Sequence, residues 1–169
     1  MMFRSLFVAA ILTLSSCGYH LVGHGDGTGA VPADVTTVSV QAVGEAAKPF
    51  LFDLKHQLEG NDHYKLIDAE SVSDEKSHAV IRIEQASESF VPSAYDSSGI
   101  AIQYRMTIQG IVRLYRAGSL IWESGVISKS GDVYVTGGPT DVEASRKRIQ
   151  EELRSEWTVA VSSRISSGF

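Results

Sequence analysis

The stretch that decides the fold is IAIQYRMTIQGIVRL, residues 100–114. From Ile100 to Leu114 the even positions hold apolar or aromatic side chains, with Gly110 as the exception, whereas the odd positions are mostly polar. Side chains on a β-strand alternate between its two faces, so a period of two places one face in a core and leaves the other outside. We therefore predict a long strand here whose even positions face the core.

A turn and a return strand are predicted directly downstream. Residues 116–119 read RAGS, a short glycine-containing segment typical of a hairpin turn. Leu120, Trp122 and Val126 are expected to continue the apolar face on the return strand, and the Gly-Asp pair at 131–132 is expected to interrupt it. One long hairpin should therefore dominate the sheet.

Shorter elements are predicted before this hairpin. Residues 35–43 and the segment that begins at Ala79 alternate in polarity and predict strands. Between them, residues 49–58 carry an apolar residue every fourth position and predict a helix, and residues 64–67 predict a short strand. The serine-rich segment 87–99 contains a proline and predicts a long exposed turn.

The C-terminal part predicts one long helix. Gly137, Gly138 and Pro139 end the sheet, and Thr140–Glu143 has the spacing of a capping box. Helical periodicity then joins six apolar residues: Val142, Ile149, Leu153, Trp157, Val161 and Ile165. The basic run at 146–148 could form a docking patch, but acidic residues one turn away favour a solvated face.

The predicted fold is an α+β, two-layer sandwich. Two helices, each with one apolar face, pack on one face of a mostly antiparallel sheet of about four strands dominated by the long hairpin. Residues 34–169 form this single domain. The uncovered sheet face carries Arg82, Arg105 and Arg113. A polar face of this kind can be solvent surface or can contact a partner, and the sequence leaves both alternatives open.

Residues 1–16 predict a secretory signal peptide. Arg4 precedes an apolar run at 6–14, and two serines follow it. This run is much shorter than the roughly 20 residues that a membrane-spanning helix needs. Cys17 comes next and is the only cysteine, so it has no intramolecular disulfide partner. The order Leu-Ser-Ser-Cys resembles a bacterial lipobox, which implies acylation, palmitate included, at Cys17, whereas a buried structural cysteine is the less favoured alternative.

Residues 17–33 predict a tether between the lipid anchor and the domain. Glycines occupy every second position from 23 to 29, and such spacing confers flexibility. His20, His24 and Asp26 could be metal ligands, but the glycines oppose the helix that would place both histidines on one face. A phosphate-binding glycine loop would need a preceding strand, which this segment lacks.

Composition and motifs exclude several function classes. The chain has 15 basic and 20 acidic residues, a net charge of −5, which argues against a nucleic-acid partner. No metalloprotease, nucleophile-elbow, Cys-x-x-Cys or Walker motif is found. The five histidines are scattered. We therefore expect neither an enzyme nor a cofactor.

Two segments resemble the lipopolysaccharide-assembly lipoproteins of the LptE family. They are Cys17–Leu21, directly after the lipobox, and Gln103–Ile108, which opens the hairpin ahead of the final helix. The resemblance runs over most of the mature chain. It implies a sandwich of two helices and four strands that plugs an outer-membrane β-barrel of the LptD type. It further implies that the protein helps this barrel to assemble, assists lipopolysaccharide transport to the outer leaflet and catalyses no reaction.

The resemblance also implies a location and a ligand. A lipid-anchored chain with Gly18 after the cysteine would reside at the outer membrane, with its domain in the periplasm or inside the barrel lumen. The family has basic residues near the turn before the central strand, whereas this chain has Tyr95–Gly99 there. Arg82, Arg105 and Arg113 are the remaining candidates for contact with the barrel or with lipopolysaccharide. The alternative function is a lipoprotein scaffold of another envelope machine, such as a secretion pore or a lipid transporter.

Overall fold

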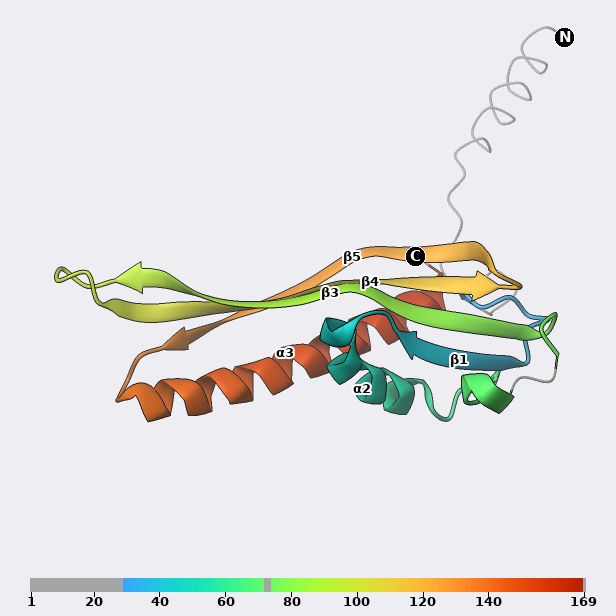
Figure 1. Cartoon of the computed structure of the whole chain (residues 1–169), viewed down its shortest axis with the longest axis horizontal. Helices are drawn as coiled ribbons and strands as arrows, with labels where there is room; N and C mark the ends of the chain where they lie inside the picture. The colour runs from blue at the N-terminus through green and yellow to red at the C-terminus, as the bar shows by residue number, and fades with distance from the viewer. Residues whose placement is uncertain (1–28, 72–73, 169) are drawn as a thin grey trace, which may run out of the picture.

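The computed structural model describes residues 29–71 and 74–168. Its fold is α+β, with a sheet of order β2-β1-β3-β4-β5 and with helices α2 and α3 on one face of that sheet (Figure 1). The prediction of two helices on one face is therefore confirmed. The sheet has five strands rather than about four, and it is mixed, because β1 is parallel to both of its neighbours.

The parallel part of the sheet follows from the first crossover. β1 (Thr37–Ala42) leads through a 3-10 turn (Glu45–Ala47) into α2 (Lys48–Leu58), which returns the chain to β2 (Lys65–Leu66). A helix between two strands brings the second back in the same direction as the first. A further 3-10 turn, Ala69–Ser71, precedes the long strands.

Three long strands form the rest of the sheet: β3 (His78–Tyr95), β4 (Ala101–Arg116) and β5 (Ser119–Tyr134). The predicted turn at 87–99 is wrong, because β3 continues to Tyr95 and pairs with β4 over nearly all of its length. The chain turns only at the segment around Asp96. The Asp96 carboxylate accepts hydrogen bonds from the backbone N–H groups of Ser98 and Ile100, both at 2.9 Å. Backbone pairing extends this strand although its side chains lack apolar alternation.

The return strand also differs from its prediction. β5 runs through Gly131 and Asp132 without a break. Gly125 has a φ of 64°, and the pairing with β4 shifts register beside it. A one-residue shift moves side chains to the other face. Val126 is consequently 61% exposed, and Ile127 faces the core in its place.

Helix α3 (Pro139–Ser167) begins earlier than the capping-box spacing predicted. Gly138 is the N-cap residue, and its N–H donates to the Asp141 carboxylate at 3.0 Å. Pro139 suits the first helical position because its missing N–H would have no helical partner there. The helix ends at Gly168, whose φ of 76° is the left-handed conformation common after helix C-termini.

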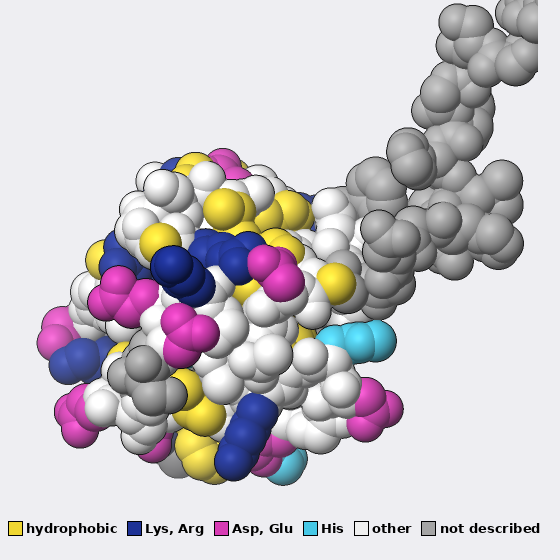
Figure 2. Space-filling model, turned by 90° about the vertical axis from the view of Figure 1, so that its right-hand side faces the viewer, with side chains coloured by type: hydrophobic (Ala, Val, Ile, Leu, Met, Phe, Trp, Pro, Cys, Tyr) yellow, Lys and Arg dark blue, Asp and Glu magenta, His cyan; other side chains and the backbone are white. Residues whose placement is uncertain are grey.

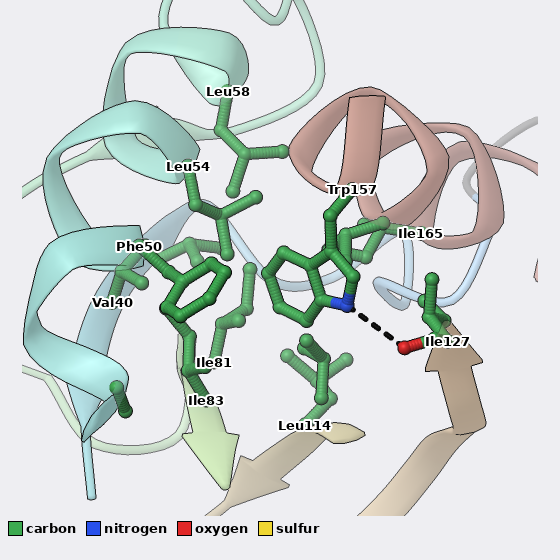
Figure 3. Packing of buried hydrophobic residues seen from close by; sticks show 14 of the residues in the cluster. Val40, Phe50, Leu54, Leu58, Ile81, Ile83, Leu114, Ile127, Trp157 and Ile165 are labelled. Atoms are coloured by element: carbon green, nitrogen blue, oxygen red, sulfur yellow. Dashed lines mark hydrogen bonds between the residues drawn. The ribbon is translucent and has the colours of Figure 1, made fainter. Parts of the chain in front are cut away.

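Trp157 lies at the centre of the core (Figure 3). Its ring meets Phe50 of α2 edge to face, with 5.0 Å between the centroids, and its Nε1 donates to the Ile127 carbonyl at 3.0 Å. The predicted inward residues of β4 from Met106 onward lie in the same core, and most of those predicted for α2 and α3 complete it: Phe50, Leu54, Leu58, Met106, Ile108, Val112, Leu114, Leu153, Trp157, Val161 and Ile165.

The molecule is elongated, and its two ends differ (Figure 1). α2 and β1 cover one end, where the described chain starts with the Ala30 N–H donating to the Ile165 carbonyl at 2.7 Å. At the other end β3 and β4 extend beyond the helices. We call this projection, residues 90–104, the ribbon end. The core therefore occupies only part of the length of the sheet.

Candidate functional site

The predicted lipid-attachment residue, Cys17, lies outside the described residues, as do the signal peptide and residues 17–28 of the tether. Within residues 29–71 and 74–168, no helix has the length and apolarity to cross a membrane. The same ranges contain no group of three or more His, Cys, Asp or Glu side chains arranged to hold a metal ion. The candidate site that the structure can describe is therefore the sheet face with the three arginines.

Strand alternation places all three arginines on the sheet face that the helices do not cover. Arg82 lies between the buried Ile81 and Ile83 of β3, and Arg113 lies between two buried residues of β4. Arg82 and Arg113 are direct cross-strand neighbours. Arg105 lies further along β4. The structure thus brings two of the three candidates together.

Arg113 is held between two carboxylates of neighbouring strands. Its Nε donates to Glu123 Oε2 at 2.6 Å, and its Nη1 donates to Glu84. The hydrogen bonds that Arg113 donates, first to Glu123 and then to Glu84, raise the pKa of its guanidinium. Because charge-assisted pairs of this kind already occupy the guanidinium donors, Arg113 is poorly placed to bind a further anion.

Arg105 forms a two-point ion pair with Asp132 of β5. Its Nε and Nη2 donate to the two carboxylate oxygens at 2.9 and 3.1 Å. This hydrogen bonding raises the pKa of Arg105 and lowers that of Asp132. The pair sits at the surface, with 54% of the Arg105 side chain exposed, so solvent screens it.

Arg82 differs from the other two, because no carboxylate of the described chain lies within ion-pair distance of it. Its Nε donates to the Gln41 side-chain oxygen at 3.4 Å, and its guanidinium lies 4.5 Å above the centre of the Tyr115 ring. Arg82 also lines a cavity of about 270 Å³ on the outer face of the sheet. Sequence alone could not separate it from Arg105 and Arg113.

A hydrogen-bonded polar trio lies beside Arg82, and two of its members, Ser39 and His78, line this cavity. The ring nitrogens of His78 are each 3.0 Å from a hydroxyl, Nδ1 from Thr37 and Nε2 from Ser39. His78 is 5% exposed and Ser39 only 1%. Burial lowers the pKa of His78, which favours the neutral ring at neutral pH. The sequence analysis missed this trio because the three residues lie on two strands that are far apart in the chain.

The ribbon end is a second feature that sequence reasoning missed. Ile100 and Ile102 were predicted to face the core, but they are 64% and 44% exposed. Helix α3 does not extend beneath this part of the sheet, so alternation there leads to no core. Five exposed apolar or aromatic side chains lie on or next to this end: Val91, Tyr95, Ile100, Ile102 and Tyr134. They do not form one patch, because Val91 and Tyr134 pair with Arg105 and Gln103 on the outer face, whereas Ile102 lies on the opposite face of β4. Ile100 and Ile102 are therefore the candidate contact residues on that opposite face.

The opposite end of the molecule has a different surface (Figure 2). Acidic and basic side chains are interspersed there rather than gathered by sign. One such pair joins Arg116 Nη1 to Asp34 Oδ1 at 3.0 Å. This end therefore resembles ordinary solvated surface, and the ribbon end and the arginine-bearing face remain the candidate contact surfaces.

The arrangement defines a class by its fold. It is a two-layer α+β sandwich with three long antiparallel strands, of which β3 and β4 extend beyond the helix layer. Solved bacterial lipoproteins of the rare lipoprotein B type share this fold. No family model matches the chain, and no curated protein matches it.

Three solved structures illustrate the likeness. Uncharacterized lipoprotein B from Nitrosomonas europaea has a TM-score of 0.63 at 16% identity, covering 90% of this chain and 92% of that one. Rare lipoprotein B from Shewanella oneidensis has a TM-score of 0.59 at 14% identity, and the match covers 77% of this chain and 90% of that one. A minor lipoprotein from Acinetobacter baumannii has a TM-score of 0.60 at 12% identity, and the match covers 80% of this chain and 93% of that one. At these identities the likeness is one of fold.

Proposed function

We propose that this protein is a non-enzymatic outer-membrane lipoprotein, anchored through Cys17, that plugs and helps assemble an LptD-type β-barrel and assists lipopolysaccharide transport. One combination carries this proposal. The chain has the fold of lipoproteins of the rare lipoprotein B type, and its single cysteine directly follows the segment that the sequence predicts to be a signal peptide. Neither observation alone would be sufficient, because folds host many functions.

The charge arrangement of the arginine-bearing face supports this role. Arg105 and Arg113 are neutralised within the sheet by Asp132, Glu84 and Glu123. The part of the face around Arg105 and Arg113 can therefore enter a polar, water-filled lumen without leaving these two ions unpaired. It can also pack against a barrel wall at low desolvation cost.

The ribbon end supports contact with a large partner. Its exposed apolar side chains project at the end of the molecule opposite to the start of the described chain (Figure 1). A chain tethered to a membrane at one end can therefore present the ribbon end to a partner at the other. Ile100 and Ile102 are the natural anchor residues there, since aliphatic side chains exposed to this degree gain most from burial in an interface.

The first test is affinity purification of the tagged protein from detergent-solubilised outer membranes of its own host, with mass spectrometry of the co-purifying proteins. We expect a large β-barrel protein in about equal amount, and less of it with Cys17→Ala. Recovery of the protein alone, or with a pore or transporter of another system, would contradict the plug and favour a scaffold of another envelope machine.

A double variant tests the ribbon end in the same assay. Ile100→Ser with Ile102→Ser should reduce recovery of the barrel while the melting temperature of the purified protein stays unchanged, because both side chains are exposed. Val159→Ser, at an exposed position of α3, is the matched control and should leave recovery unchanged. Equal losses in both variants would argue against a contact at the ribbon end.

A further inference from the structure

Arg82 is the one candidate arginine whose terminal guanidinium nitrogens have no acceptor in the described chain. Arg105 and Arg113 donate hydrogen bonds to carboxylates. Arg82 donates only through Nε, to the neutral side-chain amide of Gln41. The Tyr115 ring holds the guanidinium plane from one side. A stacked guanidinium is pre-oriented, so it loses little freedom when it binds a two-oxygen acceptor.

The cavity around Arg82 is built from segments that converge only in the folded chain. β1 supplies Ser39 and Gln41, β3 supplies His78 and Arg82, and Tyr115 closes the side next to the hairpin turn. The side-chain oxygen of Gln41 accepts the hydrogen bond from Arg82, so the Gln41 amide hydrogens remain available as donors. Polar donors therefore line the cavity together with the guanidinium.

We propose that this cavity binds one small oxyanion group, of which phosphate is the representative, through the Arg82 guanidinium and the Gln41 amide. A volume of about 270 Å³ admits a group of the size of a headgroup. The group can belong to a soluble phosphorylated compound or to the headgroup of a lipid, since both present the same oxygens. This site goes beyond the barrel partnership and does not depend on it.

Glu75 supplies an internal check, because it is the one acidic residue that lines the cavity. Its side chain is exposed at the rim, and its negative charge opposes the binding of an anion. Glu75→Gln should therefore tighten oxyanion binding, whereas Arg82→Gln should weaken it. A purely structural role of Arg82 in the sheet predicts no effect at Glu75.

The test is a titration of the full-length protein in detergent with sodium phosphate at constant ionic strength. NMR signals of the Arg82 Nε–H group and of the His78 ring report on the cavity. We expect saturable shifts with a Kd of about 1 mM or tighter. Affinity should fall at least about tenfold in Arg82→Gln and rise in Glu75→Gln. Arg105→Gln removes an arginine from the same face and should leave the affinity unchanged.

Three results would overturn the site. They are shifts that do not saturate, equal effects of Arg82→Gln and Arg105→Gln, and unchanged or weaker binding in Glu75→Gln. Since a gain of affinity in Glu75→Gln cannot come from misfolding, it separates binding from a loss of structure. Competition with vesicles that contain phosphatidic acid, against vesicles of phosphatidylcholine alone, then identifies a lipid headgroup or a soluble compound as the source of the oxyanion.

Discussion

Asp132 and Arg105 form the most exposed of the arginine pairs on the outer face, and their protonation is directly measurable. The Arg105 hydrogen bonds lower the pKa of Asp132 from its ordinary value of 3.8. A carboxyl whose pKa is lower in the folded state stabilises the fold above its unfolded pKa, and this contribution is lost as the pH falls through the folded value. The pair therefore contributes at neutral pH and not in strong acid.

We predict that the pKa of Asp132 changes when its partner Arg105 is removed. In Arg105→Gln the pKa of Asp132 should rise toward 3.8, because the charged hydrogen-bond donors are gone. An NMR titration of side-chain carboxyl carbons measures it. Asp34, whose pKa is lowered by Arg116 instead, is the internal control and should not change. Equal shifts at both carboxyls would contradict a local cause.

Trp157 should contribute more to stability than any single surface pair. It is fully buried, and its Nε1 donates to the Ile127 carbonyl. Trp157→Ala should lower the free energy of unfolding by about 3–5 kcal/mol, because truncation of a buried aromatic leaves a large cavity. Val159→Ala, on the exposed side of the same helix, should change it by less than about 0.5 kcal/mol. Urea unfolding measures both, and similar values would contradict the central position of Trp157.

At the scale of elements, one close approach determines how α3 lies on β5. A Cβ added at Gly131 would come within 2.8 Å of Ile149 Cδ1, so it would have to push the end of the Ile149 side chain aside. Gly131→Ala should therefore destabilise the fold by about 1–3 kcal/mol through overpacking. The sequence analysis expected a strand break at this glycine. In the structure the strand continues, and Gly131 lies where α3 packs on β5.

A second substitution checks this explanation. Ile149→Val removes the Cδ1 atom that would clash, so Gly131→Ala should cost less in the Ile149→Val background than alone. A double-mutant cycle from urea unfolding gives the coupling free energy, expected at about 0.5–1.5 kcal/mol for residues in contact. Additive effects would show that Gly131 is required for its backbone conformation rather than for space.

At the scale of the whole molecule, the sheet joins an apolar core to the ribbon end, and polar contacts hold β3 against α3 at the point where the ribbon end begins. Glu88 of β3 accepts from the Gln150 side chain and lies 3.4 Å from Arg154 Nε. The Arg146 guanidinium lies 5.6 Å from the centre of the Phe90 ring. Since such half-exposed contacts are weaker than core packing, the ribbon end should open independently of the core.

Glu88→Gln tests this independence. Hydrogen exchange should accelerate by a few fold in residues 88–95 and 139–150 and stay unchanged around Trp157, because loss of a partly exposed ion pair costs no more than about 1 kcal/mol. Glu45→Gln is the matched control, since Glu45 pairs with Lys48 at the start of α2, away from the ribbon end. Uniform acceleration across the chain would indicate that the molecule opens as one unit.

The sequence by itself determined the elements that carry strong periodicity. Helix α2, helix α3 and the inward face of β4 from Met106 to Leu114 follow their patterns, since each buries one face against the core. The signal peptide and Cys17 remain sequence predictions, because residues 1–28 lie outside the described structure. Local patterns determine which face of an element can be buried.

Only the tertiary structure decided the features that depend on distant neighbours. Residues 87–95 form a strand because β4 supplies backbone partners, and Ile100 is exposed because α3 ends before it reaches the ribbon end. Arg105 and Arg113 find their β5 partners, Asp132 and Glu123, on opposite sides of the register shift at Gly125. Hydrogen bonds and burial between segments far apart in the chain leave no local trace in the sequence, so the pairing of Arg105 and Arg113 and the lack of a carboxylate partner for Arg82 were visible only in the fold.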